Sequence, residues 1–432
     1  MPTQYLSTHD FSDPDIVLAG SLIDGTGAEP RPDVALLLHL GRLDRIISRD
    51  ALSPGMIQGA RVLDLSGSTV MPGMMDTHAH LTFSALDSHD AVRKQVSGES
   101  DATLALRALR NGLAHLAAGV TTLRDTGGRG FVTLDVRDAI ASGLAPGPRI
   151  QASGPAITTT GGHLNYLGLI ADGAEALRAA CIQVMDRGAD YIKLCATGGI
   201  MTAESDPMRP QYDTAALAGA VAVAEERGTL VAAHSLSAEA LVQCVEAGVR
   251  SIEHCLWQDE PGIFRFRPEV ADVMIQKNIF AGLTFAGIAQ MRFRSRVLGQ
   301  SVPDDLGVWM TRLEARYEAE KEMLARGVRY VLHSDAGVRE TPFGAFWLIP
   351  ASACYELELT PLQAIRAITQ SPAELMQIGE DVGTLEPGKV ADFLVYEKSP
   401  ADNIRNIQSP RAVFQSGRLT VDAGSLIVRT LK

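Results

Sequence analysis

Six residues whose side chains could together bind or bridge metal ions lie within or at the end of predicted β-strands. Imidazole nitrogens and carboxylate oxygens are common ligands of zinc and related divalent cations. A pair of such cations can activate water for hydrolysis. The set therefore predicts a two-metal hydrolytic site, provided that the fold brings the strand ends together. Its members are His78, His80, Lys193, His234, His254 and Asp335.

The segment MDTHAHL contains the densest part of this set. Side chains alternate between the two faces of a strand, so His78 and His80 point to the same side and can reach one ion. A lone His-x-His is a weak signal, because it also arises by chance. Asp76 shares the parity and is a candidate to orient one of the ligand imidazoles.

Lys193 lies in the middle of the apolar segment YIKLCA. A buried ammonium is costly, so the lysine is expected to pair with a carboxylate, to extend to solvent or to be modified. A free ammonium has no lone pair to offer a metal ion. Addition of carbon dioxide converts it to a carbamate, an anion that can bridge two cations.

The other members of the set end later strands. A single histidine at a strand end is more often structural, but His234 and His254 end consecutive strands downstream of the His-x-His and Lys193. Asp335 is suited both to bind one ion and to take a proton from bridging water. His333 shares the strand parity of Asp335 and is expected to support the site or to pack.

One further histidine is a candidate for substrate contact. His163 lies in the glycine-rich segment TTTGGHLNY, where glycines let the backbone approach a ligand closely. Four histidines fall outside strand ends and are interpreted as surface or helix residues: His9, His39, His89 and His115.

These residues can converge only if their strands run parallel and end on one face. Helical segments 174–188, 214–228 and 237–248 alternate with short apolar strands, and each ends in glycine, a common C-cap. This alternation predicts parallel βα units and an α/β fold, with a (β/α)₈ (TIM) barrel whose chemistry lies at the C-terminal strand ends. The eight predicted strands lie near 69–76, 120–125, 148–153, 191–196, 230–235, 251–255, 279–285 and 330–335.

The two ends of the chain have a different pattern, with short strands and turns instead of βα units. We therefore divide the chain into an N-terminal β-segment at 1–70, a barrel at 71–375 and a C-terminal β-segment at 376–432. Two long loops are predicted over the active face of the barrel, at 196–212 and 285–305.

Composition describes an ordinary globular protein of 432 residues, 46% hydrophobic and 21% charged. The net charge of -12 argues against nucleic acid or an anionic membrane as the main partner. The five cysteines include no CxxC pair, which favours reduced thiols. No apolar stretch is long enough to span a bilayer and no signal peptide is recognised, so a cytoplasmic location is expected.

The whole set resembles the amidohydrolase superfamily over essentially the full length of the chain. The resemblance is carried by MDTHAHL, IKLCATGG, HSDAG and, after the barrel, GTLEPGKVADFLVYE. It implies a distorted barrel with a small β-sandwich built from both chain ends, and a binuclear centre, usually of zinc. In that centre His78 and His80 would hold the more buried ion with Asp335, His234 and His254 would hold the second, and carboxylated Lys193 would bridge the two. A homo-oligomer is also implied, with an octamer as one expectation.

Within the superfamily, RDTGG, TTTGGH and IKLCATGG are most similar to metal-dependent dipeptidases that act on Xaa-Pro, Xaa-Arg and related bonds, a group that includes ochratoxin-hydrolysing amidases. His163 matches the substrate-binding histidine of that group. One position departs from it: Leu236 stands where some members have a tyrosine that helps to polarise the scissile carbonyl.

The leading functional hypothesis is a metal-dependent hydrolase of a dipeptide or N-acyl amino acid, in which a bridging hydroxide attacks the amide carbonyl. The alternative is an imidazolonepropionase-like hydrolase or deaminase of the same superfamily, but those members place a glutamate where this chain has Ser237. A third hypothesis, a scaffold protein without catalysis, conflicts with the complete ligand set. A substrate carboxylate would need a cation, and seven arginines in the expected active-face loops stay open as candidates: Arg129, Arg265, Arg267, Arg292, Arg294, Arg296 and Arg339.

Overall fold

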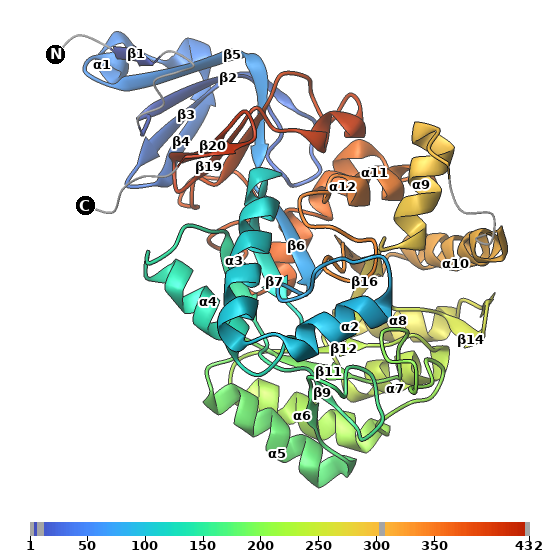
Figure 1. Cartoon of the computed structure of the whole chain (residues 1–432). Helices are drawn as coiled ribbons and strands as arrows, with labels where there is room; N and C mark the ends of the chain where they lie inside the picture. Colours follow the sequence, from blue (N-terminus) through green and yellow to red (C-terminus); the bar gives the residue numbers. More distant parts are fainter. Residues whose placement is uncertain (1–3, 7–12, 302–306, 428–432) are drawn as a thin grey trace.

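The structure is a computed structural model that describes residues 4–6, 13–301 and 307–427. Strands from both chain ends form one nine-stranded sheet, which lies at one end of the molecule (Figure 1). The N-terminal strands are β1 (Gln4–Leu6), β2 (Ile16–Leu22), β3 (Arg31–His39), β4 (Arg42–Ser48) and β5 (Arg61–Pro72). The C-terminal strands are β18 (Phe393–Tyr396), β19 (Ala412–Gln415), β20 (Arg418–Asp422) and β21 (Ser425–Leu426).

This sheet builds a β-sandwich because both of its faces are apolar. Along β2, Val17 and Ala19 join one buried cluster, whereas Ile16 and Leu18 join another. Alternate residues of a strand face opposite sides, so the same strand contributes to two cores. The two chain ends meet where β18 pairs antiparallel with β5, with Leu394 opposite Met71.

The eight predicted barrel strands are all present, which confirms the distorted (β/α)₈ barrel. They are β6 (Met74–Ala79), β7 (Val120–Asp125), β8 (Arg149–Ala152), β11 (Ile192–Cys195), β12 (Val231–His234), β13 (Ser251–Glu253), β16 (Phe280–Thr284) and β17 (Arg329–His333). The strands β6 to β8 form one parallel sheet. The other five barrel strands, β11, β12, β13, β16 and β17, form another with the short β9 (Ile157–Thr158) and β10 (Leu169–Ile170) at its edge. A parallel bridge between Ala79 and Ala336 joins β6 to the end of β17.

The first barrel strand begins later than the predicted 69–76, because the chain passes from one sheet to the other at Gly73. Residues Thr69–Pro72 belong to β5 of the β-sandwich, and β6 starts at Met74. A β-carbon at Gly73 would lie 2.0 Å from Thr121 Oγ1, so only glycine lets the two strands approach this closely.

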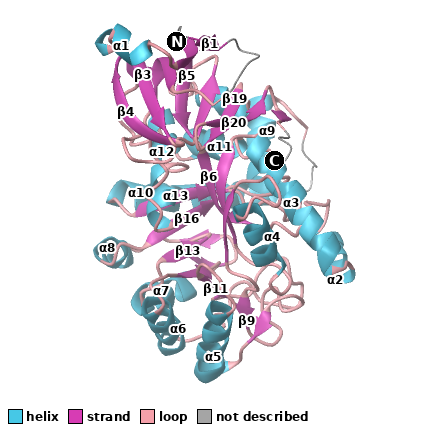
Figure 2. Cartoon of the chain, turned by 90° about the vertical axis from the view of Figure 1, so that its left-hand side faces the viewer, coloured by secondary structure: helices cyan, strands magenta, loops and turns pink. Residues whose placement is uncertain are grey.

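Helices surround the barrel strands (Figure 2). The three predicted helices that end in glycine are α5 (Gly173–Asp186), α6 (Thr214–Glu226) and α7 (Ala238–Ala247). Gly248 caps α7 with a φ of 85°, a left-handed conformation that suits glycine. The other helices are α1 (Pro54–Ile57), α2 (His89–Gly98), α3 (Asp101–Ala117), α4 (Val132–Ala141), α8 (Pro268–Gln276), α9 (Ile288–Leu298), α10 (Gly307–Arg326), α11 (Leu348–Glu356), α12 (Pro361–Arg366) and α13 (Gln370–Leu375), with 3-10 turns η1 (Arg49–Ala51) and η3 (Ile404–Gln408).

One of the two predicted active-face loops is partly helical. The segment 285–305 contains α9, which buries Arg292 and Phe293, and its last residues lie outside the described residues. The segment 196–212 contains no helix or strand. After β13 the chain forms a small hairpin of β14 (Gln258–Glu260) and β15 (Ile263–Phe264).

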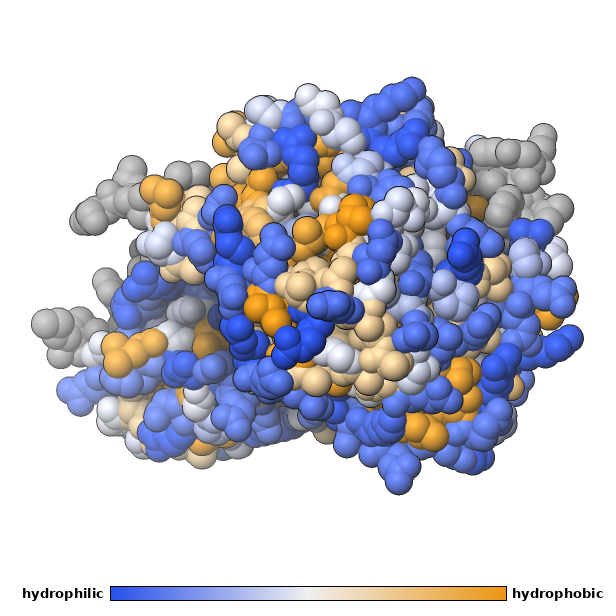
Figure 3. Space-filling model, turned by 90° about the horizontal axis from the view of Figure 1, so that it is seen from below, coloured by the Kyte–Doolittle hydropathy of each residue, from blue (hydrophilic) through white to orange (hydrophobic). Residues whose placement is uncertain are grey.

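The surface seen in Figure 3 is mixed, with apolar patches among mostly hydrophilic side chains, as on most folded proteins. Across the described ranges, no helix has the length and apolarity that crossing a bilayer requires.

Candidate metal centre

The first and last barrel strands bring His78, His80 and Asp335 together. The backbone N–H of Asp335 donates to the carbonyl oxygen of His78 at 2.8 Å, and that of His80 donates to Ala336 at the same distance. The Nε2 atoms of His78 and His80 lie 3.5 and 3.3 Å from Asp335 Oδ1. One ligand atom from each residue therefore converges on a single point that could hold a metal ion.

The two imidazoles are held so that Nε2 faces this point. His78 Nδ1 lies 2.7 Å from Glu253 Oε2, and His80 Nδ1 lies 2.7 Å from the carbonyl oxygen of Gly127. Both partners are acceptors, so each Nδ1 carries the proton and each Nε2 keeps its lone pair. Asp335 Oδ1 is buried without a hydrogen-bond partner among the described residues. These free acceptors are what a cation would satisfy, so the site fits a metal ion.

Glu253 is the centre of a buried ionic network behind His78. Besides His78, it accepts hydrogen bonds from Arg124 at 2.7 Å and from Ser251 at 2.5 Å, and its side chain is fully buried. Burial alone would raise the pKa of Glu253, but Arg124 and then Lys193 lower it, to about 2. The glutamate therefore stays ionised and fixes the tautomer and the orientation of His78.

The sequence interpretation did not identify Glu253 or Arg124. Both lie inside buried parallel strands, β13 and β7, as Lys193 lies inside β11. The reasoning that selected Lys193 applies equally to them, because a charged residue in such a strand needs a partner or a role.

His234 and His254 lie beside the first group. Their ring centroids are 4.6 Å apart, and the His254 ring is 5.2 Å from that of His78. His234 Nε2 lies 3.2 Å from the carbonyl oxygen of Gly198, which can accept its proton and leave Nδ1 free as a ligand atom. Burial lowers the pKa of both histidines well below the usual value, so both imidazoles are neutral.

Two residues of the set have strained backbone. His254 and Asp335 have φ values of 66° and 57°, in the left-handed region that residues other than glycine rarely adopt. Such conformations persist only where the surrounding structure enforces them, and they concentrate at functional sites.

Lys193 lies among these histidines without a partner. Its side chain is 2% exposed, and Nζ has neither an ion pair nor a hydrogen bond within the described parts of the chain. Two of the three expectations for Lys193, pairing with a carboxylate and extension to solvent, are therefore wrong. Burial lowers the pKa of Lys193, which favours the neutral amine.

His163 packs flat on His234, with ring centroids 4.4 Å apart and an interplanar angle of 25°. Its Nδ1 is buried without a hydrogen-bond partner in the described structure. Gly199 makes the position possible, because a β-carbon there would lie 2.2 Å from this nitrogen. Burial is the main cause that lowers the pKa of His163, to about 3, so the ring is neutral.

Asp76 does not orient a ligand imidazole, contrary to expectation. It accepts hydrogen bonds from the backbone N–H groups of His78 and Ser334, at 3.2 and 3.1 Å, and from the ring of His115 at 3.2 Å. Asp76 thus ties together the two segments that carry the ligands. His333 has the supporting role that we expected, since it hydrogen-bonds Thr284 at 2.6 Å.

Two histidines interpreted as surface or helix residues contribute to the site's surroundings. His115 lies in helix α3, as that interpretation allows, but it is completely buried against Asp76. His89 opens α2 and lies half-buried over the barrel, with Nδ1 2.7 Å from Met201 Sδ of the segment after β11.

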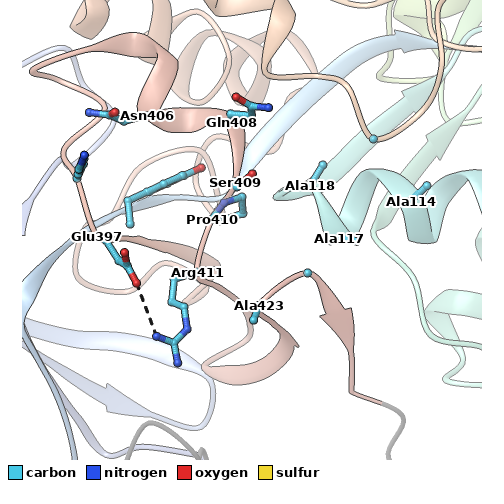
Figure 4. Close-up of a pocket in the computed structure, with 14 residues that line it drawn as sticks. Ala114, Ala117, Ala118, Glu397, Asn406, Gln408, Ser409, Pro410, Arg411 and Ala423 are labelled. Atoms are coloured by element: carbon cyan, nitrogen blue, oxygen red, sulfur yellow. Dashed lines mark ion pairs between the residues drawn. The ribbon is translucent and has the colours of Figure 1, made fainter.

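A cleft elsewhere in the molecule is separate from this site. It lies between α3 and the segment from Tyr396 to Arg411, and Arg411 forms an ion pair with Glu397 at 3.9 Å there (Figure 4). None of the six predicted ligands lines it. The cleft lies at the junction of barrel and β-sandwich. Because it contains none of the predicted ligands, we assign the chemistry to the barrel interior.

Comparison with known proteins extends this assignment to the whole chain. The model of the amidohydrolase family matches residues 69–420. Ochratoxinase of Aspergillus niger is 27% identical over 433 aligned residues, which cover 94% of this chain and 86% of the relative. Imidazolonepropionase of Chromobacterium violaceum is 23% identical over 428 residues, which cover 90% of this chain and 92% of the relative.

A solved structure is also similar to this chain over nearly its whole length. The crystal structure of a Xaa-Pro dipeptidase with methionine bound in its active site has a TM-score of 0.77 to this chain at 26% identity. The match covers 94% of this chain and 98% of the other. The similarity therefore extends over the barrel and the β-sandwich.

Proposed function

This chain belongs to the amidohydrolase family and hydrolyses amide bonds, and we propose that its substrates are dipeptides or N-acyl amino acids. The observation that carries the proposal is the convergence of His78 Nε2, His80 Nε2 and Asp335 Oδ1 beside the unpartnered Lys193. Two similar proteins support the substrate class: one is named an ochratoxinase and the other a Xaa-Pro dipeptidase.

The family is generally metal-dependent, and we propose a binuclear zinc centre. His78, His80 and Asp335 would hold one ion, and His234 and His254 the other. A carboxylated Lys193 would bridge the two, since its buried Nζ has no partner of its own in the described structure. When bound, the two ions supply hydroxide near neutral pH and polarise the scissile carbonyl.

The residues of the chain would then handle protons and the substrate. Asp335 takes the proton of the attacking water and passes it to the amide nitrogen as the carbon–nitrogen bond breaks. His163, neutral and aimed into the site, donates a hydrogen bond to the substrate carbonyl or holds the substrate backbone. Leu236 is buried and apolar and offers no donor, so this task falls to His163.

The similarity to imidazolonepropionase supports the alternative activity, hydrolysis or deamination of a cyclic substrate. One contact disfavours it. Ser237, at the position where those relatives place a proton-transferring glutamate, is the N-cap of α7, and its Oγ accepts from the backbone of Ala240 at 3.3 Å. This hydroxyl has a structural role and is a poor acid or base near neutral pH.

The test of the proposed function is turnover by the zinc-loaded protein of a library that contains dipeptides, N-acyl amino acids and imidazolone-4-propionate. Release of free amino acid from a dipeptide or an N-acyl amino acid supports the proposal. Turnover of imidazolone-4-propionate alone would replace it with the alternative.

We expect two divalent ions per chain. The physical reason is the presence of two imidazole pairs with one carboxylate and one lysine between them. Elemental analysis of protein purified without chelator should give about two equivalents. Full activity at one equivalent would contradict the binuclear centre.

We expect His163→Asn to lower kcat/KM without changing metal content. His163 lies in the segment after β9, which supplies none of the six proposed ligands, so its loss should remove a contact with substrate and leave the metal ligands in place. If its ring binds the carbonyl oxygen, kcat should also fall, since such a donor acts on charge that develops in the transition state. Steady-state kinetics with elemental analysis checks both points. Loss of one metal equivalent would instead make His163 a ligand, and unchanged kinetics would leave it a structural role.

A further inference from the structure

The seven arginines of the active-face loops are not equivalent in the structure. Five of them have acidic partners, and two, Arg294 and Arg339, form no ion pair with any described residue. The five pairs are Arg129 with Asp101, Arg265 and Arg267 with Asp259, Arg292 with Glu356, and Arg296 with Glu314. Arg265 and Arg267 share the single carboxylate of Asp259, and the side chain of Arg265 is 70% exposed. The two arginines without any acidic partner among the described residues, Arg294 and Arg339, are therefore the first candidates to bind a substrate anion.

Arg339 lies in the short loop that follows the ligand Asp335. The backbone N–H of Val338 donates to the carbonyl oxygen of Asp335 at 3.4 Å, and that of Glu340 donates to Leu86 at 3.1 Å. The carbonyl oxygen of Arg339 accepts from Thr341 Oγ1 at 3.1 Å. These bonds fix the loop against the segment after β6, so the backbone of Arg339 has a defined position close to the metal ligands.

The neighbours of Arg339 are the loops that cover the site. Val338 packs in one apolar cluster with Phe83, Leu164 and Met201, which belong to the segments after β6, β9 and β11. Leu164 directly follows His163, the residue that we place on the substrate. Arg339 therefore directly follows a residue that packs among the segments after β6, β9 and β11.

Two charges from this ring act on one imidazole. Burial lowers the pKa of His89, the Arg339 guanidinium lowers it further, and Asp335 raises it. His89 in turn contributes to the lowered pKa of His163. The guanidinium of Arg339 and the carboxylate of Asp335 are therefore both close enough to His89 to influence its charge.

Arg339 also has a donor that nothing satisfies. Its Nε is buried and has no hydrogen-bond partner among the described residues. A buried N–H without an acceptor is unfavourable, and arginine is well suited to bind a carboxylate with two parallel hydrogen bonds. Arg294, on α9, has no such buried donor.

We infer that Arg339 binds the α-carboxylate of the amino acid that hydrolysis releases. This carboxylate is two bonds from the scissile nitrogen, so a cation that recognises it must lie close to the metal ligands, as Arg339 does. The inference rests on the proposed function and deepens it. The enzyme would select amides with a free carboxylate next to the scissile bond and would reject esters, carboxamides and longer peptides that lack one there.

The test compares an acid with its carboxamide, in turnover and in binding. For turnover, the probes are N-benzoyl-L-phenylalanine and N-benzoyl-L-phenylalaninamide. For binding, they are N-benzyl-L-phenylalanine and its carboxamide, in which a methylene group replaces the scissile carbonyl so that hydrolysis is impossible. Each is measured with the zinc-loaded full chain as wild type, Arg339→Gln, Arg339→Lys and the control Arg294→Gln.

The wild type is expected to prefer the acid over the carboxamide by about 10- to 100-fold, the range for a hydrogen-bonded charge pair. Arg339→Gln should remove this preference, mainly through KM and Kd. Arg339→Lys should keep part of it, and Arg294→Gln all of it, with metal content unchanged in every variant. This pattern in both assays supports the inference.

Two outcomes overturn the inference and leave the proposed function standing. One is an acid preference that survives Arg339→Gln, and the other is turnover by the wild type without any acid preference. If no library member is hydrolysed but the acid still binds more tightly in an Arg339-dependent way, the proposed function fails and the carboxylate site stands. Binding without acid preference, or no binding, in a protein that hydrolyses nothing overturns both.

Discussion

Replacing Lys193 with alanine is expected to abolish turnover and release bound metal, and acetate or propionate is expected to restore part of both. The Lys193 side chain is buried, so its removal leaves a cavity beside the histidines. An unmodified ammonium would repel two cations, whereas a carbamate balances their charge. A short carboxylic acid can enter the cavity and place its two oxygens where the carbamate had been.

Activity and elemental analysis, with and without each additive, check this expectation. Lys193→Met is the matched control, since it fills the same space without leaving room for an acid and should not be rescued. Addition of ethylamine tests the opposite possibility, that the free amine of Lys193 is the group that the site needs. Rescue by the amine and not by the acids would mean that Lys193 acts as a free amine, and retained activity with full metal content would remove it from the centre.

Asp335→Asn is expected to lower kcat by roughly 10²-fold or more, the range for a group that transfers a proton in the transition state. The amide oxygen of asparagine can still offer a lone pair to a cation, but it cannot accept a proton. The rate must be expressed per metal-loaded protein, because Asp335 is also a proposed ligand. Asp272→Asn, which changes an exposed carboxylate on α8, is the control: it removes the same charge far from the proposed ligands and should keep the wild-type rate.

The measurement is steady-state kinetics on the best substrate of the library, followed across pH. Loss of kcat with a near-normal KM would match the proposed role. A variant that keeps both its metal and its rate would assign proton transfer to another group.

The barrel and much of its candidate centre could be predicted from sequence because two signals are local. Strand parity places His78 and His80 on one side, and a charged residue in an apolar strand marks Lys193. Both signals depend only on the alternation of side chains and the cost of burying charge. The prediction that these strand ends converge needed only the general rule for parallel barrels.

Other parts of the site depend on pairings that no local pattern carries. Glu253 and Arg124 are 129 residues apart in the chain and meet across the barrel. His89 reaches the site because α2 folds back over the barrel to Met201, 112 residues away. The choice of Arg339 likewise required the ion pairs of the other arginines, which are a property of the folded loops.

The closure of the barrel between β6 and β17 has a consequence for how the protein matures. Thr77 and His333, on the first and last strands, are 256 residues apart, and the hydrogen bonds that join His78 to Asp335 span a similar distance along the chain. Contacts of such long range carry a large loop-closure entropy and tend to form slowly. A chain that has just emerged from the ribosome with seven strands complete would carry five of the six proposed ligands without a closed site. Uptake of the first ion would then require that the barrel has closed, so only protein with a completely folded barrel would bind metal.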